Sequence, residues 1–93
     1  MIKSFACKKT EAVWNGKNQR SFPETILRRA FRKLKMLAAA TALDDLRFPP
    51  GNHLEQLQGD RIGQHSIRIN DQYRVCFLWD GQHAHNVEIV DYH

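Results

Sequence analysis

The chain has 93 residues, of which 42% are hydrophobic and 26% charged, and its net charge is +4 at pH 7. This length and composition fit one small globular domain with a single core and leave no room for a second. Residues 1–4 lead directly into an alternating segment rather than an apolar signal sequence, and no apolar run is long enough to cross a bilayer, so we expect a cytoplasmic protein without a membrane partner.

The positive charge is concentrated in the N-terminal part of the chain. Residues 1–40 contain ten Lys and Arg against two acidic residues, whereas residues 41–93 contain four Arg against eight acidic residues. The basic part fits either a broad footprint for nucleic acid or a solvated helix face, and charge alone does not separate the two.

The first predicted elements are a strand and a short helix. Residues 3–8 alternate between polar and apolar side chains, which predicts a half-polar strand at a sheet edge. Residues 10–17 predict a short helix with Thr10 as its N-cap and an end near Gly16.

The strongest helix signal begins at Ser21. Ser21 and Glu24 form a capping-box pattern, and Pro23 lies in the expected first turn. Apolar side chains then recur at helical spacing through Ala38. On or beside the opposite face lie the basic residues Arg28, Arg29, Arg32, Lys33 and Lys35.

A second helix start and a loop follow. Thr41 and Asp44 predict a short helical turn through Leu46. Residues 47–52 predict an irregular loop, because paired prolines and a Gly-Asn sequence stop regular structure.

The remaining residues predict a β-sheet. Residues 54–57 and 65–70 predict two strands joined through a turn at Gly59 and Asp60. The next strand alternates as well, and its core-facing side chains are Tyr73, Val75, Phe77 and Trp79. With the N-terminal helices on one face, we expect an α+β fold: a small antiparallel sheet with a mixed edge.

The last hairpin sets which side chains share the open face of the sheet. Residues 80–82 predict a three-residue loop that pairs Val75 with Val87 and keeps the apolar faces together. This register places Arg68, Arg74 and Tyr92 on the face away from the helices.

The C-terminal half supplies groups for metal-free cleavage of a phosphodiester. Attack of a 2′-hydroxyl on the adjacent phosphate needs a base, an acid for the leaving oxygen and cations that stabilise the transition state. Arginine suits the last role because its fork matches phosphate oxygens and stays protonated. Glu55, Asp91 or His93 can be the base, and His93 can be the acid. Tyr92 can stack on a nucleobase or donate a hydrogen bond.

Each assignment has a structural alternative. Arg68 and Arg74 can pair across the sheet with Glu88 or Asp91, as is common on exposed sheet faces. Arg61 can be a solvated charge in a glycine-rich turn. The widely separated cysteines and the scattered histidines show no metal-ligand pattern, so we expect reduced thiols and no metal or cofactor.

Several segments together resemble a known family. They are residues 57–61 (LQGDR), 63–70 (GQHSIRIN), 73–75 (YRV) and 88–93 (EIVDYH). In this order they look like the HigB-type killer toxins of the RelE/ParE toxin–antitoxin superfamily, and the similarity covers essentially the whole chain.

The resemblance implies a RelE-like sheet packed by N-terminal helices and ribosome-dependent cleavage of translated mRNA. It also implies a HigA-like helix-turn-helix antitoxin that represses the shared operon, so that operator DNA is bound only through the antitoxin. By position, the residues around the scissile phosphate are Arg61, Arg74, Asp91, Tyr92 and His93. As further contacts to RNA or the ribosome we expect Arg68, Gln58, Glu55, Arg28, Arg29, Arg32 and Lys33.

Two positions depart from the family pattern. Gln58 stands where well-studied relatives have a lysine, and Glu55 stands where some have a histidine. These differences motivate an alternative, a catalytically weak or inactive module that binds its antitoxin or the ribosome and acts in operon regulation. The gyrase-poisoning branch of the superfamily lacks the acid/base set, so Tyr92 and His93 argue against it.

Overall fold

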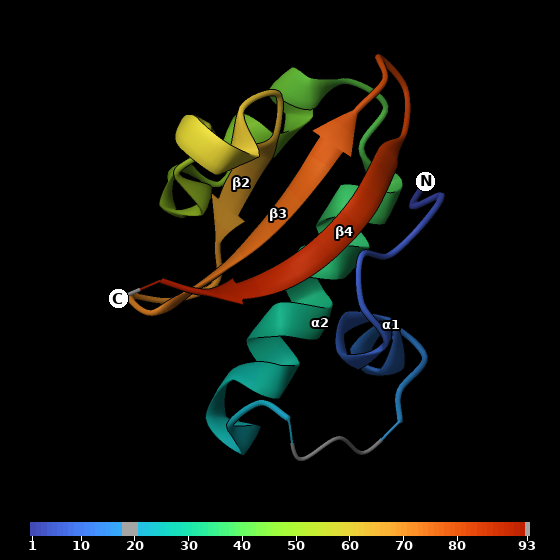
Figure 1. Ribbon diagram of the computed structural model, residues 1–93, viewed down its shortest axis with the longest axis vertical. Coiled ribbons are helices and arrows are strands. Elements are labelled where there is room, and N and C mark those ends of the chain that lie inside the picture. Colours follow the sequence, from blue (N-terminus) through green and yellow to red (C-terminus); the bar gives the residue numbers. More distant parts are fainter. Residues whose placement is uncertain (18–20, 93) are drawn as a thin grey trace.

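The structure is a computed structural model that describes residues 1–17 and 21–92. Helices α1 (Lys8–Trp14) and α2 (Glu24–Ala39) pack on one face of a four-stranded antiparallel sheet (Figure 1). In sheet order, the strands are β1 (Glu55–Gln56), β2 (His65–Arg68), β3 (Tyr73–Trp79) and β4 (Ala84–Asp91). The 3-10 turns are η1 (Leu43–Arg47), η2 (Pro50–Asn52) and η3 (Gly59–Arg61). The expected α+β fold is confirmed.

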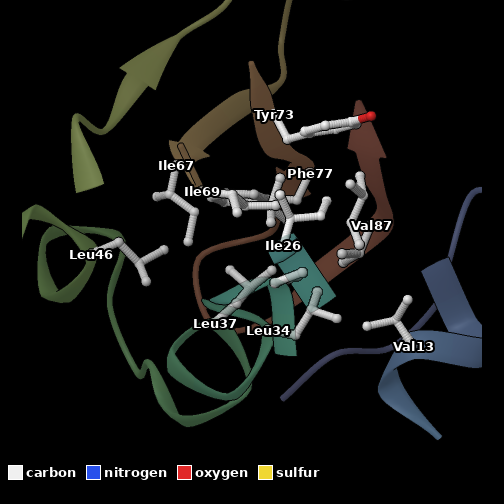
Figure 2. Close-up of a cluster of buried hydrophobic side chains, with 14 of the residues drawn as sticks. Val13, Ile26, Leu34, Leu37, Leu46, Ile67, Ile69, Tyr73, Phe77 and Val87 are labelled. Atoms are coloured by element: carbon white, nitrogen blue, oxygen red, sulfur yellow. The ribbon is translucent and has the colours of Figure 1, made fainter. Parts of the chain in front are cut away.

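The hydrophobic core lies between α2 and the sheet (Figure 2). Leu34 and Leu37 are fully buried on α2, at the helical spacing that the sequence shows. They face Ile67 on β2 and Phe77 on β3, which are also fully buried. Burial of each such side chain stabilises the fold by about 1.5–3 kcal/mol. None of the helices within residues 1–17 and 21–92 is long and apolar enough to cross a membrane.

The N-terminal segment forms the mixed edge of the sheet, but its details differ from the prediction. Two isolated parallel bridges join Ile2 to Ala84 and Phe5 to Val87, in place of a continuous strand. The prediction that Thr10 is the N-cap of the first helix is wrong, since α1 begins at Lys8. Thr10 is fully buried inside the helix, and its Oγ1 accepts a hydrogen bond of 2.9 Å from the backbone N–H of Ile89.

The start of α2 also differs from the prediction. The helix begins at Glu24 and has no side-chain cap, so the capping box of Ser21 and Glu24 is wrong. Such a box would place Phe22 in the helix, directly before Pro23. A residue that precedes proline avoids the helical conformation because the proline ring clashes with its backbone.

Asp45, rather than Asp44, holds the start of η1. Its Oδ2 accepts hydrogen bonds from the backbone N–H groups of Thr41 at 3.0 Å and Ala42 at 3.1 Å. These bonds favour the ionised carboxylate and lower the pKa of Asp45. The predicted turn through Leu46 forms, and it continues to Arg47.

The proline-rich loop is more ordered than the sequence indicates. It contains η2, and the fully buried Asn52 ties it to the preceding turn. The amide of Asn52 donates to the carbonyl oxygens of Leu46 at 3.1 Å and Phe48 at 3.2 Å. Lys33 on α2 donates to the amide oxygen of Asn52, so this lysine joins the loop to the helix.

The register of the last hairpin differs from the expected one by two residues. Trp79 pairs with Ala84 across a four-residue loop, and Val75 pairs with Ile89 instead of Val87. A bulge between these pairs contains Asn86, whose φ is +51°. The longer loop shifts the pairing by one residue and the bulge by one more, so the alternation of faces is preserved.

We predict that the left-handed backbone at Asn86 makes this position sensitive to side-chain shape. Asn86→Val should destabilise the fold by about 2 kcal/mol, because a β-branched side chain disfavours this backbone conformation. Asn86→Gly should stay within about 0.5 kcal/mol of the parent protein. Urea unfolding measures both free energies, and equal stability of the two variants would contradict the bulge.

Candidate functional site

The open face of the sheet, on the side away from the helices, carries a row of paired residues. Glu55 on β1 pairs with Ser66 on β2, Ser66 with Cys76 on β3, and Cys76 with Glu88 on β4. Ser66 and Cys76 are fully buried although they lie opposite the core. They form the floor of the candidate site.

Arg74 lies across this floor and is fixed by several acceptors. Its Nη1 donates to Ser66 Oγ at 3.1 Å and to the carbonyl oxygen of His53 at 3.4 Å. Its Nη2 donates to Glu55 Oε1 at 3.1 Å. The guanidinium lies 5.8 Å from the ring centroid of Tyr92, and the Arg74 side chain is only 17% exposed. Its ion pair joins it to Glu55, whereas the sequence suggested Glu88 or Asp91.

Arg61 approaches the same floor from η3. Its Nη1 donates to Gln64 Oε1 at 3.1 Å and to Glu88 Oε1 at 3.2 Å. Gly59 opens this turn with a φ of +65°, a conformation that glycine adopts readily. The open face therefore presents Arg61 and Arg74 together, each paired with a carboxylate.

The phenol of Tyr92 lies close enough to the thiol of Cys76 for each group to influence the pKa of the other. Burial raises the pKa of both groups, while the nearby charges of Arg61 and Arg74 oppose that rise. Both groups are therefore neutral near pH 7. In this state Tyr92 can donate a hydrogen bond to an oxyanion.

Other predicted site residues lie apart from this cluster. Asp91 pairs with Tyr73, and it lines a cavity of about 470 Å³ together with Lys8 and Lys9 of α1. Its Oδ2 accepts from the side chain of Gln72 at 3.2 Å. His93 lies outside the described residues.

Arg68 and Gln58 flank the cluster. Arg68 is the cross-strand partner of Arg74, and its guanidinium pairs with Asp71 in the turn after β2. Gln58 is exposed at the position that precedes η3.

The basic residues of α2 do not join the open face. Arg28, Arg29 and Arg32 are exposed on α2, which packs under the core face of the sheet (Figure 1). The helix that carries them thus belongs to the layer on the core face of the sheet, opposite the open face. Lys33 is half-buried against Asn52, and burial lowers its pKa, with the charges of Arg29 and Arg32 adding to this effect.

Comparison with known proteins decides the family. The family model described as the RelE-like toxin of type II toxin–antitoxin system HigB matches residues 3–93. The chain belongs to this family. Over 63 residues it is 51% identical to Toxin HigB-1 of Vibrio cholerae, a match that covers 68% of this chain and 66% of that protein. The chain thus matches slightly less than two thirds of that relative's length.

Two further proteins are similar to the chain, and the second of them shows the fold alone. An uncharacterised protein of Haemophilus influenzae is 35% identical over 72 residues, which cover 77% of this chain and 71% of that protein. The YoeB–YefM complex from Staphylococcus aureus contains a similar fold, with a TM-score of 0.62 and 18% identity. This match covers all of the present chain and 98% of that one.

Sequence reasoning missed the floor of the site. Ser66 and Cys76 are small and chemically unremarkable in the sequence, and no motif marks them. The available signal was their position in the strands: each alternates with core-facing residues and must therefore lie on the open face. Glu88 was expected only as a possible ion-pair partner on this face, and it pairs with Arg61 rather than with Arg74.

We predict that the ring of Tyr92 protects the Cys76 thiol from reagents. In a Cys7→Ser background, where Cys76 is the remaining thiol, labelling by a disulfide reagent should be slow because the thiol is buried and neutral. Tyr92→Ala should accelerate labelling roughly tenfold or more, whereas Tyr92→Phe, which keeps the ring, should change it less than about twofold. Equal rates in the two variants would contradict this placement.

Proposed function

We propose that the protein is a ribosome-dependent endoribonuclease toxin that cleaves translated mRNA by attack of a ribose 2′-hydroxyl on the adjacent phosphate. The observation that carries the proposal is the convergence of Arg61, Arg74 and Tyr92 on one face of the sheet. Two guanidinium groups and a neutral phenol are suited to a phosphate that gains negative charge in the transition state. Family membership supports the same activity.

The roles of the individual groups follow from their positions. Arg61 and Arg74 bind the phosphate oxygens, and Tyr92 donates a hydrogen bond or stacks on a nucleobase. Glu55, Asp91 and His93 remain the candidates for the base, with His93 also the candidate acid. Among the described residues of this set, Glu55 lies on the open face next to Arg74, whereas Asp91 lines the cavity beside α1.

The proposed partners are an antitoxin, the ribosome and mRNA. A type II system pairs a toxin with a protein antitoxin, and we propose a HigA-like helix-turn-helix protein for this role. The similar Staphylococcus aureus structure is likewise a complex of two proteins, YoeB and YefM. The exposed arginines of α2, Arg28, Arg29 and Arg32, are suited to ribosomal RNA that contacts the helical layer. Operator DNA would be bound only through the antitoxin.

We predict that Arg74→Ala abolishes growth inhibition and slows cleavage of mRNA on translating ribosomes by roughly 10²–10³-fold. The reason is the loss of a fixed cation at the reacting phosphate. Mapping of RNA ends after induced expression measures the effect, and circular dichroism checks that the variant folds. Arg47→Ala is the matched control, since Arg47 is exposed and pairs with Asp44 away from the site. Intact transcripts and normal growth with the parent protein would refute the proposal.

A second candidate function is a weakened toxin that acts mainly through antitoxin or ribosome binding. The observation that favours it is the charge balance of the site. Glu55 and Glu88 neutralise both arginines, and Gln58 stands next to η3 where the family pattern has a lysine. A site with no excess positive charge stabilises an additional negative charge less well.

We predict that Gln58→Lys increases the cleavage rate roughly tenfold if the site is weakened in this way, because it adds a cation beside η3. Gln82→Lys, an exposed change in the β3–β4 loop, gives the same net charge away from the site and should have no effect. Cleavage on translating ribosomes measures both. An unchanged rate in Gln58→Lys would show that the missing lysine does not limit the enzyme.

A further inference from the structure

Glu88 holds Arg61 on the open face. The two side chains are 3.2 Å apart, and they are 32% and 31% exposed, respectively. Gln64 Oε1 accepts from the same Nη1 atom at 3.1 Å. The Nη1 atom of Arg61 thus donates to two acceptors, the charged carboxylate of Glu88 on β4 and the neutral amide oxygen of Gln64 just after η3.

The side chain of Arg61 requires partners that fix its orientation, because its backbone lies in a three-residue turn rather than in a strand. The turn follows the exposed Gln58, and the long arginine side chain has several rotatable bonds. The neighbouring sheet supplies the rigid partner, since Glu88 pairs with Cys76 in the centre of the β3–β4 ladder. The direction of the Arg61 guanidinium therefore depends on the carboxylate of Glu88.

The same carboxylate opposes an anionic substrate. Glu88 neutralises Arg61 and Glu55 neutralises Arg74, so these four side chains have no net charge around the Cys76 thiol. A phosphodiester adds a negative charge to this surface. The fork of an arginine binds carboxylate and phosphate oxygens in the same way, so one anion can replace the other. At one-third exposure, the Arg61–Glu88 pair can exchange without opening the core.

We propose that Glu88 is a displaceable counter-ion of Arg61. In the free protein its carboxylate positions the guanidinium, and on RNA binding a phosphate oxygen takes its place. Glu88 is thus a positioning residue that weakens substrate binding and preserves the geometry needed for turnover. This inference rests on the proposed nuclease function for its role in turnover, but not for the exchange of anions itself.

Two substitutions separate the charge of Glu88 from its positioning role. Glu88→Gln keeps an acceptor for Arg61 Nη1 and removes the charge, whereas Glu88→Ala removes both. On translating ribosomes, the Gln variant should lower KM roughly threefold to tenfold and change kcat by less than about twofold. The Ala variant should lower kcat roughly tenfold, because Arg61 loses its position. Glu11→Gln, an exposed change on α1, alters the net charge equally and should change neither constant.

Two outcomes on the ribosome would overturn the inference. A decrease in kcat of roughly 10²-fold or more in Glu88→Gln would make Glu88 the general base. An unchanged KM in the same variant would make the Arg61–Glu88 contact a surface ion pair without effect on the substrate.

A second measurement tests the exchange without any cleavage. Inorganic phosphate is titrated into each protein while the NMR signal of the Arg61 Nε–H group is followed. Glu88→Gln should bind phosphate roughly threefold to tenfold more tightly than the parent protein, and equal affinities would overturn the inference. If phosphate binds as expected while the parent protein cuts no RNA on ribosomes, the nuclease function fails and the counter-ion role stands.

Discussion

The alternation of side chains along β3 is the constraint on which both the core and the candidate site depend. Val75 and Phe77 are fully buried against the helical layer, so Arg74 and Cys76 must point to the opposite face. A shift of one residue would exchange these two sets and expose the core. The hydrophobic effect, which holds β3 in place, therefore also sets the position of Arg74 on a face that makes no contribution to the core.

The arginines in turn depend on the small residues beneath them. Ser66 and Cys76 have short side chains, which leave room for the Arg74 guanidinium to lie along the sheet and reach Ser66 Oγ. A charge with such low exposure is unfavourable unless acceptors and an opposite charge surround it. Glu55 supplies that charge for Arg74, and Glu88 does the same for Arg61. The carboxylates on this face are thus a consequence of placing guanidinium groups close to the sheet.

Periodicity explains how much of the structure could be predicted from the sequence. The fold class and the presence of Arg74 and Tyr92 on one face follow from periods of 3.6 and two residues, which local sequence reveals. The register of the last hairpin was predicted wrongly because the longer loop and the bulge at Asn86 each shift the pairing by one residue, and a total shift of two keeps the same faces together. Any combination of shifts with the same parity keeps the same faces together, so hydrophobic patterning does not distinguish them. The role of Thr10 and the partner of Arg61 depend on contacts between distant segments, for which the sequence has no local signal.

The two sides of the molecule differ in how they can attract RNA. Positive charge is concentrated in the N-terminal part of the chain, and its exposed arginines on α2 lie in the helical layer. Such exposed charges act over about a Debye length, roughly 8 Å at physiological salt, and so favour the approach of a polyanion. On the open face, by contrast, each arginine is neutralised by a carboxylate at contact distance.

Under the proposed function, long-range attraction therefore comes from the helical layer. In the same proposal, the reacting phosphate is recognised only at close range, where it competes with Glu88 for Arg61. If the proposed function holds, this separation lets the exposed arginines of α2 attract RNA without regard to sequence, while the open face binds only a phosphate that is held against it.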